Sequence, residues 1–160
     1  MSNDFSRNNG RMPNLDSLLS SEDINLSIIE IDDFTSGFRE IEELSNPQKT
    51  FHYIQELLRE VDNGGFNQYF INYSGDYAMD TVETLNAIGA YKTAILVQAA
   101  IDQFPGSDVP QDRDERVELV EKIEETANPI WDELDQKFFL SEDDLNALNI
   151  EFIKKHRNEF

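Results

Sequence analysis

The sequence contains no cysteine, which excludes disulfide bonds and metal sites built from thiolates. Its two histidines, His52 and His156, lie far apart in the chain, and neither belongs to a cluster with metal-ligand spacing. No apolar run approaches the roughly 20 residues that span a bilayer, and the start of the chain has no apolar segment typical of a secretory signal. These absences predict a cytoplasmic protein with no metal and no other cofactor.

Signatures of enzyme chemistry are also missing. Without cysteine, and without a local serine or histidine signature, nucleophilic catalysis has no candidate. The pair Gly64-Gly65 follows a predicted helix, whereas phosphate-binding glycine loops follow strands. The acidic segments DRDERVEL and EDDLNALN lack the glycine that a calcium-binding loop needs at its sixth position. We therefore predict no catalytic residues and a protein that is not an enzyme.

Basic residues are scarce, with 13 Lys and Arg against 33 Asp and Glu, a formal net charge of -20 over 160 residues. Such a surface repels nucleic acid and anionic membranes, so neither is expected as a direct partner. It attracts basic proteins, and more weakly as salt screens the charges. A hydrophobic content of 39% with 11 Phe residues favours a folded core over a disordered acidic chain.

The pattern along the chain predicts an all-α fold. Residues 1–20 are rich in Ser and Asn and are expected to form a flexible N-terminal arm, followed by a single compact multi-helix domain over residues 21–160. The segment INLSIIEI fits a helix or a strand, and we interpret it as a helix. Asn46-Pro47 is a good helix start, and Asn63-Gly64-Gly65 a good helix end.

The sequence after residue 76 predicts five further helices. One runs from about Tyr77 to Ile88, and residues 91–104 are apolar nearly all round, which indicates a central buried helix. An acidic helix is expected from Asp112 to Ala127, and Asn128-Pro129 is expected to start another that ends at Phe139. A last helix follows a capping box of Ser141 and Asp144.

The stretch VDNGGFNQYFINYSG combines glycines, amides and aromatic rings, and two interpretations fit it. The favoured one is structural: the glycines reverse the chain, the aromatic rings fill the core, and Asn63, Gln68 and Asn72 bond the exposed backbone. The alternative is a small-ligand or enzyme site at the 63–76 corner, using Gln68, Tyr69, Asn72 and Asp76.

Acidic residues are concentrated between Asp112 and Asp144, where 13 carboxylates face only four basic side chains. Their spacing places Asp114, Glu118, Glu121 and Glu125 along one stripe of a helix, with neighbours about 5–6 Å apart. That spacing is comparable to the spacing of backbone phosphates in nucleic acid. On spacing alone, a solvated surface is favoured over a phosphate-like display.

Four segments carry a resemblance to a known family: EVDNGGFNQYFINYSGD, ETLNAIGA, ELDQKFF and FIKKHRNEF. From about residue 46 to 160 the chain resembles the DNA-mimic protein family, whose shared domain was first described as one of unknown function. The resemblance implies a small acidic helical protein, a homodimer, and occupation of the DNA-binding surface of a transcription regulator or another nucleic-acid-binding protein. The residues that carry the family motif are interpreted as architectural: Asn63, Gly64, Gly65, Phe66, Gln68, Tyr69 and Phe70.

The leading hypothesis is therefore a DNA-mimic-like protein that binds a basic DNA-binding partner through carboxylates. The predicted partner-binding residues are Asp114, Glu118, Glu121, Glu125, Asp132, Glu133 and Asp135. An immunity or inhibitor protein against a basic nuclease or toxin would use the same electrostatics, so it stays open as an alternative. The enzyme or ligand-binding site at the 63–76 corner is the alternative from another class.

Overall fold

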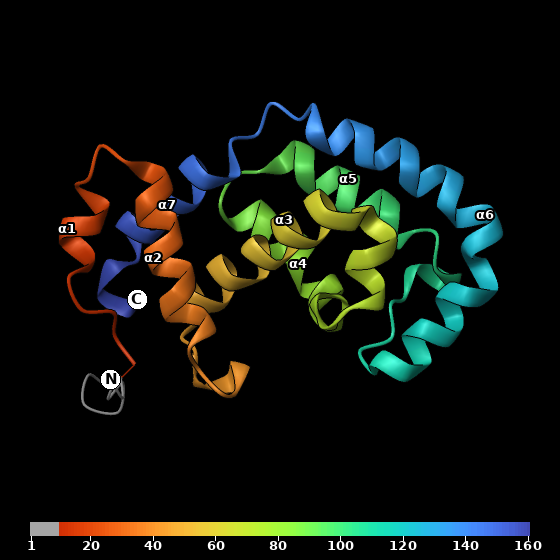
Figure 1. Ribbon diagram of the computed structural model, residues 1–160, viewed down its shortest axis with the longest axis horizontal. Helices are drawn as coiled ribbons and strands as arrows, with labels where there is room; N and C mark the ends of the chain where they lie inside the picture. Colours follow the sequence, from red (N-terminus) through yellow and green to blue (C-terminus); the bar gives the residue numbers. More distant parts are fainter. Residues whose placement is uncertain (1–9) are drawn as a thin grey trace. The chain divides into compact units, whose positions relative to one another are not determined.

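All regular secondary structure in residues 10–160, the part of the chain that the computed structural model describes, is helical (Figure 1). This confirms the predicted all-α fold. The α-helices are α1 (Leu15–Leu19), α2 (Ile24–Ser36), α3 (Asn46–Ile71), α4 (Ala78–Ala87), α5 (Tyr91–Ile101), α6 (Arg113–Phe139) and α7 (Leu145–Lys155). Short 3-10 turns η2 (Ile41–Glu43), η3 (Tyr73–Tyr77), η4 (Pro105–Ser107) and η5 (Arg157–Glu159) connect or end them.

The chain divides into two compact units. The terminal unit combines residues up to His52 with Leu145–Phe160, and the central unit is Tyr53–Asp144. The first nine residues of the expected N-terminal arm lie outside the described residues. Within the rest of that arm, α1 buries Leu15 and Leu19 in the core of the terminal unit. A single domain over residues 21–160 stays a prediction.

In the terminal unit, α2 packs against α7 around a small apolar core. The ambiguous segment INLSIIEI is a helix, as predicted, and the Asp23 carboxylate caps it by accepting a hydrogen bond from the Leu26 N–H at 3.0 Å. The buried side chains that form the core come from both ends of the chain: Leu15, Leu19, Ile28, Ile31, Phe51, Ile150, Ile153 and Phe160.

The start of α3 is capped by Ser45, one residue before the predicted position. Ser45 and Gln48 form a capping box, in which each side chain accepts a hydrogen bond from the other's backbone N–H, at 2.8 and 3.3 Å. The Gln48 amide also donates to the carbonyl of Gly10, at 2.7 Å, and to that of Phe160. One buried glutamine therefore ties both ends of the described chain to the first turn of α3.

In the central unit, α3 is interrupted at the predicted glycine pair. Gly65 has φ of 74°, a left-handed conformation that favours glycine, and a new helical segment starts at Phe66. Farther along, α5 packs against both α4 and α6, as expected of a central helix. Its burial is one-sided, however, because Tyr91 and Ile95 are exposed.

The two helices expected over residues 112–139 are one 27-residue helix, α6. Pro129 was expected to start a new helix, but it lies inside α6. A proline inside a helix removes one backbone hydrogen bond and kinks the axis, and α6 is visibly curved in Figure 1. Among residues 10–160 no helix combines the length and the hydrophobicity of a membrane span.

Replacement of Gly65 by alanine is expected to cost about 2–4 kcal/mol in the free energy of unfolding. The new Cβ would strain the left-handed backbone and would lie 2.8 Å from Cγ of Asp135, displacing a carboxylate that bonds the Phe66 N–H. Gly106→Ala is the matched control, because Gly106 has φ of 66° and open space around it. It should cost only about 1–2 kcal/mol. Urea unfolding measures the loss in free energy of unfolding for both variants. Equal losses would contradict this prediction, because they would show that the Asp135 carboxylate moves aside without cost.

Candidate partner-binding surface

Helix α6 carries all seven predicted partner-binding residues and has one buried and one acidic side. The Asp112 carboxylate caps it by accepting a hydrogen bond from the Glu115 N–H at 2.9 Å. Trp131 is fully buried and donates its indole N–H to the Ala100 carbonyl of α5 at 3.0 Å. The buried side recurs every three or four residues, at Arg116, Val120, Ala127, Trp131, Leu134 and Phe138. The opposite side is therefore left to solvent.

The most heavily bonded side chain of the central unit is the guanidinium of Arg116, which has no exposed surface. A buried charge is tolerated only where its hydrogen bonds are satisfied. All five N–H donors of Arg116 have acceptors. They are the carbonyls of Phe70 (2.5 Å), Asn72 (2.9 Å), Pro110 (2.9 Å) and Gln111 (2.9 Å), and the carboxylate of Asp76 (2.6 Å).

Gly75 and Arg113 lie close to this site, and both contribute to the packing of α6 against the end of α3. A Cβ at Gly75 would lie 2.6 Å from Nε of Arg116 and 2.7 Å from the Phe70 carbonyl oxygen, so no larger residue fits there. Arg113, one turn earlier, donates to the Ile71 carbonyl at 2.9 Å, and its guanidinium lies 5.1 Å from the centre of the exposed Tyr73 ring. The first turn of α6 is thus fixed to the end of α3 by two arginines.

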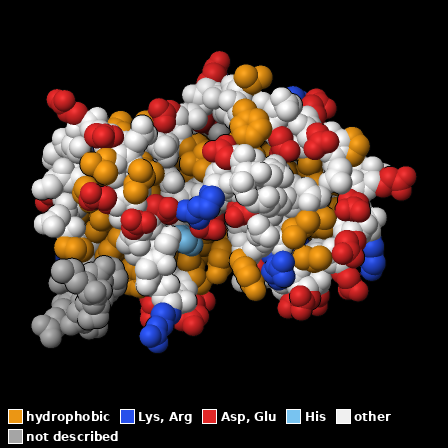
Figure 2. Space-filling view, in the orientation of Figure 1, with side chains coloured by type: hydrophobic (Ala, Val, Ile, Leu, Met, Phe, Trp, Pro, Cys, Tyr) orange, Lys and Arg blue, Asp and Glu red, His pale blue; other side chains and the backbone are white. Residues whose placement is uncertain are grey.

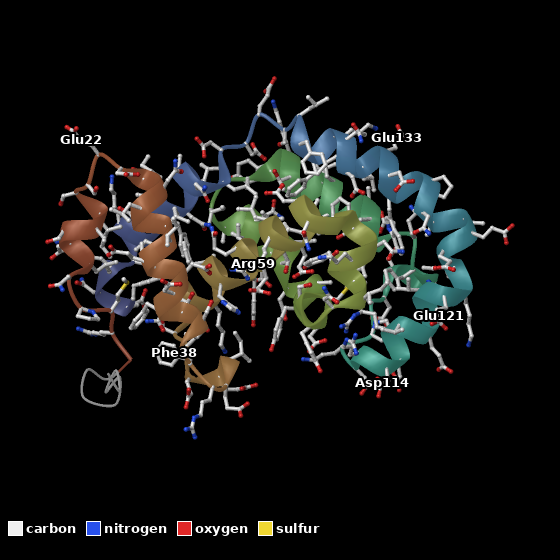
Figure 3. The ribbon with its side chains drawn as sticks, in the orientation of Figure 1. Glu22, Phe38, Arg59, Asp114, Glu121 and Glu133 are labelled. Atoms are coloured by element: carbon white, nitrogen blue, oxygen red, sulfur yellow. The ribbon has the colours of Figure 1, made fainter. Side chains whose placement is uncertain are left out.

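Four of the predicted residues form an unpaired acidic row on the outer side of α6: Asp114, Glu118, Glu121 and Glu125. All four are exposed, and none makes an ion pair with any residue in the described part of the chain. Figure 3 shows Asp114 and Glu121 pointing outward from the first half of α6. Acidic side chains gather over the same helix in Figure 2. The structure therefore brings these four carboxylates onto one exposed face.

The other three predicted residues differ from one another. Asp132 is exposed. Glu133 is exposed but pairs with Lys137 at 3.2 Å, one turn away on the same helix. Asp135 is half-buried, and its carboxylate accepts a hydrogen bond from the Phe66 N–H at 2.8 Å. Burial raises the pKa of Asp135 above its ordinary value, although the Phe66 N–H acts in the opposite direction. Asp135 thus caps the helical segment that starts after Gly65.

The corner at 63–76 is filled by its own side chains. Phe66, Tyr69 and Phe70 are fully buried, and the Tyr69 hydroxyl donates to Thr81 at 3.0 Å. Burial raises the pKa of Tyr69 above its ordinary value. These observations support the structural interpretation of the family motif.

The polar groups of the corner also have internal partners. The amides of Gln68 and Asn72 donate to the Glu60 carboxylate at 3.0 and 2.6 Å, instead of bonding the backbone as expected. Asp76 accepts a hydrogen bond from Arg116. The side chains proposed for a ligand site are therefore used within the fold. Within residues 10–160, no three His, Cys, Asp or Glu side chains are grouped to hold a metal ion.

The buried position of Arg116 was not predicted from the sequence, although the helical pattern indicates it. Arg116 lies four residues before Val120 and is in phase with Ala127 and Trp131, so helical periodicity places it on the buried side of α6. An arginine in an apolar register requires acceptors nearby. The acceptors Phe70, Asn72 and Asp76 have no sequence signature, because they belong to chain segments at least 40 residues away.

Replacement of Arg116 by methionine is expected to lower the free energy of unfolding by about 3–5 kcal/mol, because Asp76 and four carbonyls lose their donor. Arg116→Lys should recover only part of this loss, since an ammonium cannot reproduce the planar fork of donors. Arg113→Met is the control and removes one hydrogen bond and the contact with the exposed Tyr73 ring, so it should cost only about 1–2 kcal/mol. Thermal and urea unfolding provide the values; a loss at Arg116 no larger than at Arg113 would contradict this assignment.

The stability of Asp135→Asn relative to the wild type should depend on pH. Because the pKa of Asp135 is raised in the folded chain, its contribution to stability is fully present below the ordinary value of 3.8 and is lost as pH rises through the folded-state pKa. Asparagine keeps an acceptor for Phe66 without the charge. The free energy of unfolding of the variant should therefore rise relative to the wild type across this window. A difference that stays constant from pH 3 to 7 would refute the assignment.

Comparison with known protein families identifies a family to which the chain is similar. The family model for the DMP19-like protein matches residues 42–156. The matched range includes α3 with its glycine kink and all of α6, and it leaves α1 and α2 outside. A search of curated proteins and a search of solved structures each found no match. The matched range covers well over half of the 160 residues, and the chain therefore belongs to the DMP19-like protein family, a family of DNA mimics.

Proposed function

We propose that this protein is a non-enzymatic, cytoplasmic DNA mimic. Its acidic row binds a basic DNA-binding protein, a transcription regulator, and blocks the surface that would otherwise contact DNA. The observation that carries the proposal is the row itself: Asp114, Glu118, Glu121 and Glu125 are exposed on one helix face and make no ion pair with residues 10–160. Membership of a DNA-mimic family supports the same function.

The row suits this role because no basic side chain of residues 10–160 pairs with its carboxylates. A carboxylate already paired with a lysine, such as Glu133, gains less from a second cation. Each carboxylate of the row can instead form an ion pair with a Lys or Arg of the partner, without first breaking an ion pair within its own chain. Asp132 and Glu133 extend the surface toward the end of α6. We assign Asp135 the supporting role of fixing the Gly65 kink against this helix.

The fixed first turn of α6 also supports the proposal. Arg113 and Arg116 hold this turn by hydrogen bonds to the end of α3, so the helix axis that carries the row does not have to be ordered on binding. A preorganised surface loses less conformational entropy when it binds. A rigid row of charges is also what a DNA-binding surface, shaped for a stiff duplex, would recognise.

We further propose that the protein acts as a homodimer. The resemblance to DNA mimics implies it, and a second copy would double the number of exposed carboxylates that one partner can meet. Sedimentation equilibrium tests it directly.

The proposed function is tested with a neutralised row. The test variant combines Asp114→Asn, Glu118→Gln, Glu121→Gln and Glu125→Gln. The control variant neutralises four exposed acids of the terminal unit: Glu22→Gln, Glu30→Gln, Asp33→Asn and Glu40→Gln. Both variants carry the same net charge, so they separate a specific surface from overall attraction. Each is used as bait in a host lysate, and captured proteins are identified by mass spectrometry.

The wild type and the control variant should capture a DNA-binding protein that duplex DNA or high salt releases. The row variant should lose that capture, and the salt slope of binding should fall by about 1 for each contact removed. Equal loss of capture in both variants would show that binding depends on net charge and not on the acidic row. Recovery of no nucleic-acid-binding protein at low salt would overturn the proposal, and recovery of a nuclease would favour an inhibitor of that nuclease.

A further inference from the structure

An apolar patch lies exposed at the end of the central unit where α6 stops. It consists of Leu140, Ile95, Tyr91 and Phe139, whose exposed fractions are 83%, 69%, 64% and 53%. We call these four residues the end patch. Figure 2 shows apolar side chains together beside the C-terminal end of α6. Single exposed apolar side chains are ordinary, whereas a group of large ones marks an interaction surface.

Hydrogen bonds between α5 and the chain after α6 hold the two halves of the end patch together. The Thr93 N–H and hydroxyl donate to the Asp143 carboxylate at 2.8 and 2.9 Å, and the Thr93 hydroxyl lies 3.3 Å from that of Ser141. These bonds join the first turn of α5 to the segment directly after Leu140. Tyr91 and Ile95 are four residues apart and so share one face of α5. The end patch is therefore a defined surface and not a set of loose side chains.

The charges around the end patch are of both signs, unlike those of the acidic row. Lys92 pairs with Glu142, and Lys137 pairs with Glu133. Asp143 is directed inward, to Thr93. Two of only 13 basic residues in the chain thus stand at the margin of this patch and neutralise the nearest exposed glutamates. An apolar surface with both signs at its margin suits a basic partner less well than the acidic row does, and a strongly acidic partner better.

A second copy of this chain fits these requirements. Two chains of net charge -20 repel each other over most of their surfaces, and they can approach closely only where the local charge is low. A two-fold contact brings the same patch of each chain together, so a surface with both signs at its margin complements itself. Large aromatic and aliphatic side chains supply the apolar centre that such an interface needs.

We propose that the end patch is the face through which two copies of the chain associate. The inference rests on the proposed homodimer and adds its location. Because Phe139 ends α6 and Leu140 directly follows it, the contact brings the C-terminal ends of two α6 helices to one axis. Each helix of 27 residues is about 40 Å long. The acidic rows of both copies then lie on either side of that axis in one assembly, with Asp132 and Glu133 nearest to it.

The test places charges in the end patch. The variant Ile95→Glu with Leu140→Glu adds two acids per chain at exposed positions, so folding should be retained; far-UV circular dichroism checks this. The control Leu26→Glu with Ile29→Glu adds the same charge at exposed apolar positions of α2. Sedimentation equilibrium should give a dimer of about twice 18.5 kDa for the wild type and the control. For the end-patch variant, the dimer dissociation constant should rise by more than about a hundredfold.

A second measurement uses the absence of cysteine from the chain. Leu140→Cys should be joined to a second copy by a thiol-specific bis-maleimide, whereas Leu26→Cys should not. Dimerisation should also strengthen with salt, because screening weakens the repulsion between the two chains, while binding through the acidic row weakens.

The outcomes separate the two proposals. A wild-type chain that stays monomeric across a wide concentration range overturns both the homodimer and this interface. A dimer that survives the Glu substitutions, or that crosslinks through Leu26→Cys, overturns the interface alone. Capture of a DNA-binding protein by the acidic row is measured independently and is affected by neither result.

Discussion

The enclosed guanidinium of Arg116 is the contact on which the arrangement of the central unit depends. Its acceptors belong to three places in the chain: the end of α3 with the residue after it, the η3 turn, and Pro110 and Gln111, just before the capping residue of α6. Any shift of the first turns of α6 would leave a buried charge and several carbonyls without partners, at a cost of several kcal/mol. The acidic row begins two residues before Arg116. Its position is therefore set by a buried contact on the opposite side of the same helix.

The acidic residues of this protein include two classes with different physical roles. Asp112, Asp135 and Asp143 accept hydrogen bonds from backbone N–H groups at or near the starts of helices. There, a carboxylate satisfies an otherwise unpaired donor and meets the positive end of the helix dipole. The carboxylates of the acidic row make no such bonds within the described part of the chain. A strongly negative composition thus includes charges that the fold requires and charges that only the surface displays.

Local pattern was enough to predict most of the fold and the location of the acidic row. The stop at Gly65, the helical nature of INLSIIEI and the buried side of α6 all follow from spacing within a few residues. The break expected at Pro129 was wrong, because packing of Trp131 and Leu134 in register with Ala127 outweighs the loss of one backbone hydrogen bond. Partners distant in sequence were not predictable. Asp135 was grouped with the surface acids, although it lies against Gly65 and the Phe66 N–H, because nothing in its neighbours reveals a contact 69 residues away.

The caps supplied from distant residues also bear on how the central unit folds. The residue before α5, Ala90, provides no side-chain cap, and the acceptor for the Thr93 N–H comes from Asp143. The helical segment after Gly65 likewise receives its cap from Asp135. These two helix starts gain their carboxylates only after the second half of α6 and the loop behind it have reached them. Long loops must close before such contacts form, so these helices become stable together, in one cooperative and comparatively slow step.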